Sequence, residues 1–270
     1  MAEATKSAGK VYLVGAGPGA PDLLTLRAAR LLGTADIVFH DALVHPEVLA
    51  LAPQATLIAV GKRCGAHSTA QRFINKRLVD AAREHAVVVR LKGGDPMLFG
   101  RAQEEIDALL AAGIAFEVVP GVTAALAAAS QLGVSLTKRG VARTVTFVTP
   151  RIGDDEDASD WVSAAVSADT AALYMGAGQA EALVAALVAH GRSADTPVVV
   201  VRNASLPDSV VRTGLLRDLP ALCRDGSAGD DGTPHPAMIL LGETLAAVAR
   251  SRNDVDALVD EAIQLRRRHG

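Results

Sequence analysis

The stretch that decides the fold is KGGDPMLFGRAQEEIDALLAAGIAFEVVPG, residues 92–121. It holds a glycine-proline loop, a helical segment with apolar residues at i, i+3 and i+4 spacing, a short strand and a second proline-glycine break. The strand 87–91 runs into the first loop, and the strand 115–119 runs into the second. Strands that end in loops of glycine and small residues are typical of an open α/β sheet, which binds ligands at its carboxyl edge.

A third glycine-rich loop, GAGPGAP at residues 15–21, follows an earlier strand at residues 11–14. Because three strands end in three such loops, the sequence predicts one small-molecule site, of the kind that enzymes have. A tight turn without a ligand explains one such loop, but it explains three of them poorly.

The first half of the chain alternates short β-branched runs with helical stretches. Strands are expected at residues 11–14, 37–39, 56–60, 87–91 and 115–119, and helices at residues 22–32, 69–84, 101–112 and 123–132. This alternation predicts an α/β domain, residues 10–138, with a mostly parallel sheet and helices on both faces. A polar, basic connector at residues 133–143 marks its end.

The second half has adjacent strands joined by short polar loops, which predicts a mixed sheet in a second α/β domain, residues 139–250. Strands are expected at residues 145–149, 171–175, 197–201, 210–213 and 237–241, and helices at residues 179–190 and 215–222. Residues 251–270 are expected to form a final amphipathic helix, whose arginines would lie at the negative end of its dipole.

Composition excludes several classes of function. The 270 residues carry a net charge of −3 and only 3% aromatic residues, so we expect no nucleic-acid partner. Two cysteines far apart in the chain predict no disulfide framework, and no apolar run is long enough for a membrane span. His40 and His45 lack further ligands for a zinc set, so no metal is expected. Cytoplasmic localisation is the default.

A nucleotide-binding loop is the rival interpretation of GAGPG, with Asp41 as the acid at the end of the second strand. A dinucleotide fingerprint, however, requires G-x-G-x-x-G, whereas Gly15, Gly17 and Gly19 stand two apart. Pro18 also lacks the backbone N–H that a pyrophosphate would bind. The spacing therefore disfavours an NAD(P)-dependent oxidoreductase.

Five motifs together carry a specific resemblance. They are VYLVGAGPGAPDLLTLRAARLLGTADIVFHDALV (residues 11–44), GKRCGAH (61–67), VVRLKGGDPMLFGR (88–101), FEVVPGVTAA (116–125) and LYMG (173–176). In this order and spacing they resemble the uroporphyrinogen-III C-methyltransferases of the tetrapyrrole methylase superfamily, over roughly residues 10–245. The resemblance implies two α/β domains with S-adenosylmethionine bound between them, a homodimer, and methylation of uroporphyrinogen III at C2 and C7 to precorrin-2, toward sirohaem or cobalamin.

The resemblance also implies which residues contact the cofactor. These are Pro18, Gly93, Gly94, Asp95, Leu98, Thr123, Ala124, Met175 and Ala204. Small residues suit this donor, because a sulfonium is cationic and carries no phosphate. Asp95 has an alternative role as a turn residue whose carboxylate binds backbone N–H groups.

For the acceptor, methylation of an electron-rich pyrrole is followed by loss of a proton, which a carboxylate can accept. The resemblance implies Asp41 as this base and Lys62 as the proton donor or charge stabiliser. An aspartate at a strand end is also an ordinary cap. Basic residues are candidates to bind the substrate's eight carboxylates, because a guanidinium pairs with a carboxylate in a bidentate manner. They are Arg63, His67, Arg101, Lys138, Arg139 and Arg151.

The sequence departs from the family pattern at several positions. Ala20 stands in place of an aspartate, Ala102 and Gln103 replace glycines, and Lys138 replaces a histidine. These departures make a related precorrin methyltransferase the first alternative. A catalytically silent tetrapyrrole-binding protein of the same fold is a further alternative, which the joint presence of Asp41, Lys62 and the cofactor loops disfavours.

Overall fold

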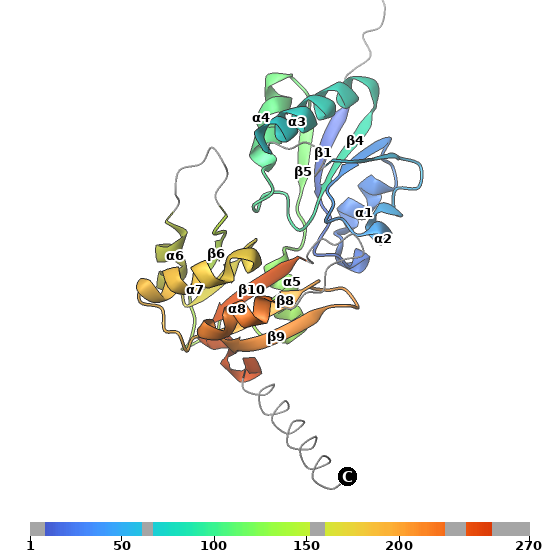
Figure 1. Ribbon diagram of the computed structural model, residues 1–270. Helices are drawn as coiled ribbons and strands as arrows, with labels where there is room; N and C mark the ends of the chain where they lie inside the picture. The colour runs from blue at the N-terminus through green and yellow to red at the C-terminus, as the bar shows by residue number, and fades with distance from the viewer. Residues whose placement is uncertain (1–8, 61–66, 152–159, 225–235, 250–270) are drawn as a thin grey trace, which may run out of the picture. The chain divides into compact units, whose positions relative to one another are not determined.

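A computed structural model describes residues 9–60, 67–151, 160–224 and 236–249, with only the backbone of residues 67–70. The chain divides into two compact units, residues 1–124 and 125–270 (Figure 1). The helix expected at residues 251–270 lies outside the described part of the chain.

The first unit is built on a five-stranded sheet in the order β3-β2-β4-β1-β5, and all of its strand pairs are parallel. The strands are β1 (Lys10–Gly15), β2 (Ile37–His40), β3 (Thr56–Ala59), β4 (Val87–Lys92) and β5 (Phe116–Val119). The helices are η1 (Pro21–Leu23, 3-10), α1 (Leu26–Leu32), α2 (Pro46–Leu49), α3 (His67–Glu84) and α4 (Ala102–Ala111). The predicted parallel sheet is confirmed.

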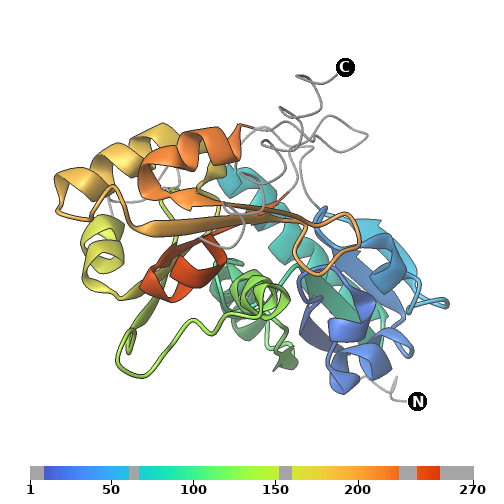
Figure 2. The same cartoon turned by 90° about the horizontal axis from the view of Figure 1, so that it is seen from below.

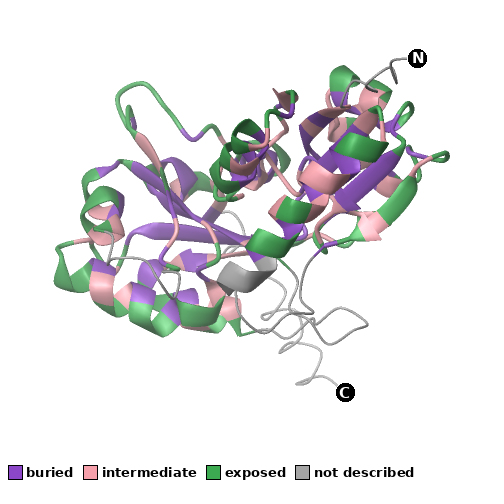
Figure 3. Cartoon of the chain, turned by 90° about the horizontal axis from the view of Figure 1, so that it is seen from above, coloured by how far each residue is buried: buried purple, intermediate pink, exposed green. Residues whose placement is uncertain are grey.

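Helices cover both faces of this sheet, because successive strand residues point to opposite sides. In β4, Val88 packs into one core with residues of α3 and α4, and Val89 packs into the other with residues of α1 and α2. Figure 1 shows α3 and α4 on one side of the strands and α1 and α2 on the other. The strands β1, β2 and β4 are mostly buried, whereas the edge strand β3 is mostly exposed. Figure 3 colours the chain by burial.

The second unit has a mixed sheet in the order β6-β7-β10-β8-β9. The strands are β6 (Val145–Val148), β7 (Thr170–Leu173), β8 (Pro197–Arg202), β9 (Val210–Leu215) and β10 (Ala237–Gly242). Only β6 and β7 pair in parallel, and β10 is antiparallel to both β7 and β8. It follows that β6, β7 and β8 run in one direction, so their carboxyl ends lie along one edge. The predicted mixed sheet is confirmed.

The helices of the second unit lie on both faces of this sheet. They are α5 (Ala124–Leu132), α6 (Trp161–Ser167), α7 (Ala180–Ala189) and α8 (Leu219–Cys223), with the 3-10 turns η2 (Ala177–Gln179), η3 (Leu216–Asp218) and η4 (Glu243–Leu245). Figure 2 shows α6, α7 and α8 on one side of the strands and α5 and η4 on the other. One core joins α6, α7 and α8 to the sheet, with Leu183, Leu187 and Leu219 almost fully buried.

The units divide earlier than residue 138, where the sequence placed the domain boundary. The helix α5 and the connector after it fall in the second unit. A physical reason is that Gln131 of α5 binds the loop after β8. Its Oε1 accepts from Ser205 N at 3.1 Å and its Nε2 donates to Ser209 Oγ at 2.8 Å.

Three helices differ from the sequence expectations. The helix expected from residue 22 begins at Leu26, because the Thr25 side chain caps it by accepting from Ala28 N at 3.1 Å. The stretch before it forms only the turn η1. The four-residue helix α2 was not expected, since a run of that length is too short to show helical periodicity. Helix α6 was also not expected.

Candidate functional site

The first unit has a topological switch point between the neighbouring strands β1 and β4. The chain leaves β1 toward α1, whose Ala28 and Leu32 lie in one core. It leaves β4 toward α4, whose Ile106 and Leu109 lie in the core on the opposite face. The crevice outside the carboxyl ends of two such strands is where open α/β sheets bind ligands.

The three glycine-rich loops meet at this point. Gly94 N donates to Gly17 O at 2.7 Å, and Gly17 N donates to Gly94 O at 3.2 Å. A Cβ on Gly15 would lie 2.6 Å from the Cα and N of Gly121 and 2.7 Å from Gly94 O. Only glycine permits this backbone contact, so the loops after β1, β4 and β5 meet. That they form one small-molecule site stays a prediction.

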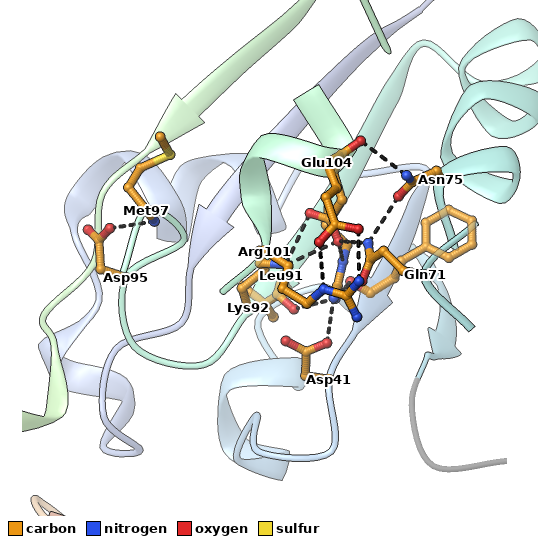
Figure 4. Close-up of polar contacts among 12 residues, drawn as sticks. Asp41, Gln71, Asn75, Leu91, Lys92, Asp95, Met97, Arg101 and Glu104 are labelled. Carbon is orange, nitrogen blue, oxygen red and sulfur yellow. Dashed lines mark hydrogen bonds and ion pairs between the residues drawn. The ribbon is translucent and has the colours of Figure 1, made fainter. Parts of the chain in front are cut away.

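Asp95 ties two of these loops together. Its Oδ2 accepts from Gly121 N at 2.9 Å, and its Oδ1 accepts from Met97 N at 2.8 Å (Figure 4). The carboxylate therefore performs the turn-forming role that the sequence analysis gave as an alternative. A direct contact of Asp95 with a cofactor stays a prediction.

Gly94 leaves open space beside the loops. Its φ is +67°, and a Cβ there would meet no atom within 4 Å. Pro18 and Leu98 are close in sequence to the loop glycines, and both are half-buried. Thr123 is buried, and Ala124 is the first residue of α5. These small and mostly apolar residues fit a donor without phosphate groups, which is the type expected from the sequence.

A buried group of charges lies beside these loops, on the α3–α4 face of the sheet. Arg90 and Lys92 are alternate residues of β4 and are 2% and 3% exposed, and Glu105 of α4 is 0% exposed. Arg90 Nε donates to Glu105 Oε1 at 2.9 Å, and Lys92 Nζ binds both Glu105 oxygens at 3.1 Å. We refer to Asp41, Arg90, Lys92 and Glu105 as the charge cluster, of which Figure 4 labels Asp41 and Lys92.

Asp41 completes the charge cluster from the loop after β2. Its Oδ1 accepts from Arg90 NH2 at 2.5 Å, and its side chain is 31% exposed. A Cβ on Gly93 would lie 3.2 Å from Cβ of Leu43, so this loop also lies against the loop after β4. The structure thus places Asp41 beside the glycine loops, held by an arginine and partly open to solvent.

The charges of the cluster act on one another. Burial lowers the pKa of Lys92, and the adjacent Arg90 lowers it further, against the attraction of Glu105. Burial also opposes the charge of Arg90, but the attraction of Glu105 and Asp41 outweighs it and raises the pKa of Arg90. The guanidinium is therefore a permanent cation beside Asp41.

The cationic candidates for substrate binding in this unit are only partly described. Lys62 and Arg63 lie outside the described residues, and His67 is described only as the first residue of α3. Arg101 is exposed and forms a bidentate pair with Glu104, at 2.6 Å and 2.8 Å. Its role toward a substrate carboxylate stays a prediction.

In the second unit, three predicted site residues follow strands whose carboxyl ends share an edge. Arg151 follows β6, Met175 follows β7 and Ala204 follows β8. Met175 has a φ of +56°, and both neighbours of Ala204 also have positive φ. Such backbone costs about 1–3 kcal/mol for each residue and is common at ligand sites. These positions suit the predicted cofactor contacts.

The remaining two candidates lie on a short exposed turn. Lys138 pairs with Ala142 through two backbone hydrogen bonds of 2.9 Å and 2.8 Å, and Arg139 is exposed within that turn. The turn presents both cations to solvent.

Sequence reasoning missed Arg90, Lys92 and Glu105, although a signal was present. In VVVRLK the two cations stand two residues apart, so both point to one face of a buried strand. Glu105 stands three residues after Ala102 and four before Leu109, both of which are buried, so it also points inward. Buried charges need partners, so this pattern predicts that each of the three has one, without showing which.

Two further observations concern the described residues only. None of their helices combines the length and apolarity that crossing a membrane requires. Within the same ranges, no group of three histidine, cysteine, aspartate or glutamate side chains is arranged to hold a metal ion.

Comparison with known proteins agrees with this geometry. The family model described as Tetrapyrrole (Corrin/Porphyrin) Methylases matches residues 10–220. Siroheme synthase from Sodalis glossinidius is 46% identical over 239 residues, which are 88% of this chain and 49% of that protein. The chain thus spans about half the length of the curated relatives it matches.

Solved structures show the same relationship. Uroporphyrin-III C-methyl transferase from Thermus thermophilus, in complex with S-adenyl homocysteine, is 38% identical with a TM-score of 0.75, covering 88% of this chain and 100% of that one. A cobalt precorrin-4 methyltransferase is 32% identical with a TM-score of 0.74, covering 87% and 95%.

Proposed function

Because the chain belongs to the tetrapyrrole methylase family, we propose that it methylates uroporphyrinogen III at C2 and C7, with S-adenosylmethionine as donor, to give precorrin-2. The observation that carries this proposal is the meeting of the three glycine loops at the switch point between β1 and β4, with open space at Gly94. We further propose that the enzyme is a cytoplasmic homodimer and that its product serves sirohaem or cobalamin synthesis.

The donor, when bound, supplies an electrophilic methyl group that the electron-rich pyrrole carbon attacks. The glycine loops would hold the donor, together with Pro18, Leu98, Thr123 and Ala124. Met175 and Ala204 of the second unit are proposed as further contacts.

The methylated ring system then loses a proton, and Asp41 accepts it. Its Oδ1 is bound by Arg90, so Oδ2 is the oxygen outside that ion pair. Lys62 is proposed to stabilise charge or return a proton on the acceptor side. Cationic residues bind the substrate carboxylates, as proposed for Arg63, His67, Arg101, Lys138, Arg139 and Arg151.

The geometry of the GAGPG loop argues against a dinucleotide. Phosphate sites use free N–H groups at the start of a helix, but the N–H of Gly17 already binds Gly94 O. The first α-helix starts only at Leu26, after the turn η1. A related precorrin methyltransferase is the second candidate, favoured by the similarity to the cobalt precorrin-4 enzyme.

Calorimetric titration with S-adenosylhomocysteine and NADH tests the cofactor assignment. We expect the wild-type protein to bind the first and not the second. Gly94→Asn should weaken S-adenosylhomocysteine binding by at least about tenfold, or 1.4 kcal/mol, because the new side chain would enter the open space. Asparagine tolerates the left-handed backbone, so the fold should persist.

Gly113→Asn is the matched control. Gly113 also has a φ of +67°, and a Cβ there also meets no atom within 4 Å, but it lies at the end of α4. This variant should bind S-adenosylhomocysteine as the wild type does. Equal affinities of the two variants, or tight binding of NADH, would exclude the proposed site.

A further inference from the structure

The buried carboxylate of Glu105 and the carboxylate of Asp41 are both bound by Arg90. Oε1 of Glu105 accepts from Arg90 Nε, from Lys92 Nζ and from Gln71 Nε2, at 2.9, 3.1 and 3.3 Å. Gln71 Nε2 also donates to Asn75 Oδ1 at 3.0 Å (Figure 4). Glu105 is therefore fixed by groups from β4 and α3 together.

Glu105 affects the position of Asp41 through Arg90, because the guanidinium is planar and its donors have a fixed relative geometry. The Nε edge faces Glu105, and NH2 faces Asp41. NH1 donates to two backbone oxygens, Leu91 O at 3.2 Å and Phe39 O at 3.5 Å. If Glu105 no longer holds Nε, the guanidinium can pivot about NH1, and NH2 then shifts relative to the carboxylate of Asp41.

We propose that Glu105 is a positioning residue, which orients Arg90 so that Arg90 holds Asp41 where it accepts the proton. The proposal rests on the proposed function, since it takes Asp41 as the proton acceptor. Glu105 itself does not touch the substrate in this account. It acts through Arg90.

The competing explanation is that Glu105 only balances the charge of Lys92. Lys92 is enclosed, since a Cβ on Gly100 would lie 3.1 Å from its Cε. Apolar residues of similar volume often replace a buried ion pair without loss of stability. Stability alone therefore does not explain why the protein keeps four charges here, and this favours a role in placing Asp41.

Two double variants separate these explanations. Glu105→Met with Lys92→Met removes one anion and one cation, so the charge stays balanced, but Arg90 Nε loses its acceptor. Glu105→Gln with Lys92→Met has the same charge balance and keeps an acceptor oxygen for Arg90 Nε. Both variants should be folded, as judged by thermal unfolding, and should bind S-adenosylhomocysteine with wild-type affinity.

We expect the first variant to lose about 10²-fold in kcat, the usual scale for misplacement of a reacting group by about 1 Å. The second variant should recover most of this loss, and KM for uroporphyrinogen III should differ little between the two. Equal kcat values would overturn the proposal and leave Glu105 as a charge partner of Lys92. Crystal structures add a readout besides activity, since the contact of Arg90 with Asp41 should be lost only in the first variant.

The outcome also separates this proposal from the proposed function. If the wild-type protein does not methylate uroporphyrinogen III, the proposed function fails, and the crystal structures alone decide whether Glu105 orients Arg90. If the wild type is active and both variants keep its kcat, only the role of Glu105 fails.

Discussion

The Asp41→Asn variant should lower kcat by about 10²–10⁴, the usual contribution of general acid–base catalysis. The amide keeps the size of the side chain and an oxygen for Arg90, but it cannot accept the proton. Affinity for S-adenosylhomocysteine should be nearly unchanged, because the charge cluster lies beside the glycine loops rather than within them. Steady-state kinetics and calorimetry on the same preparation measure both effects.

Asp36→Asn is the matched control, because it makes the same substitution near the opposite end of β2. Asp36 is exposed, and its Oδ2 accepts from Val87 N at 2.8 Å. This variant should keep the wild-type kcat. If Asp41→Asn also keeps it, Asp41 is only a partner of Arg90 that fastens the loop after β2.

A second large effect is expected for Gly15→Ala, where a single methyl group should abolish binding of S-adenosylhomocysteine. The new Cβ would lie 2.6 Å from the backbone of Gly121 and 2.7 Å from Gly94 O. Backbone atoms cannot move aside as a flexible side chain can, so the loops must separate. We expect a loss of about 3 kcal/mol in the free energy of unfolding, the upper end of the usual cost of overpacking.

The control for this variant is Gly33→Ala. Gly33 has a φ of −66°, and a Cβ there would lie 3.6 Å from Arg30 O, an ordinary contact. Thermal unfolding and binding should resemble the wild type. Wild-type binding by Gly15→Ala would show that the loops need not touch for the cofactor to bind.

The sequence predicted the fold well because its hydrophobic periodicity is strong and its glycines mark the strand ends. In the first half, each expected strand is present, and successive residues such as Val88 and Val89 enter opposite cores. The errors lie where local side chains override periodicity. Thr25 caps α1 and delays its start, and Gln131 ties α5 to the second unit.

The candidate site was only partly predictable. The sequence predicted that the three glycine-rich loops belong to one site, because each follows a strand, but it did not predict that their backbones touch. The charge cluster did not follow, because the pairing of Arg90 with Asp41 joins residues 49 positions apart. Spacing within one element shows that Glu105 points inward, but it does not show which cation it meets. That information is in the packing of α4 on the sheet.

The central claim is that this chain methylates uroporphyrinogen III, and the mass of the product tests it most directly. The wild-type protein is incubated with uroporphyrinogen III and S-adenosylmethionine labelled in its methyl group, and the product is analysed by mass spectrometry. The account predicts a tetrapyrrole that carries two labelled methyl groups. A tetrapyrrole recovered without label, from protein that binds S-adenosylhomocysteine, would contradict it and assign the methyl group to another acceptor.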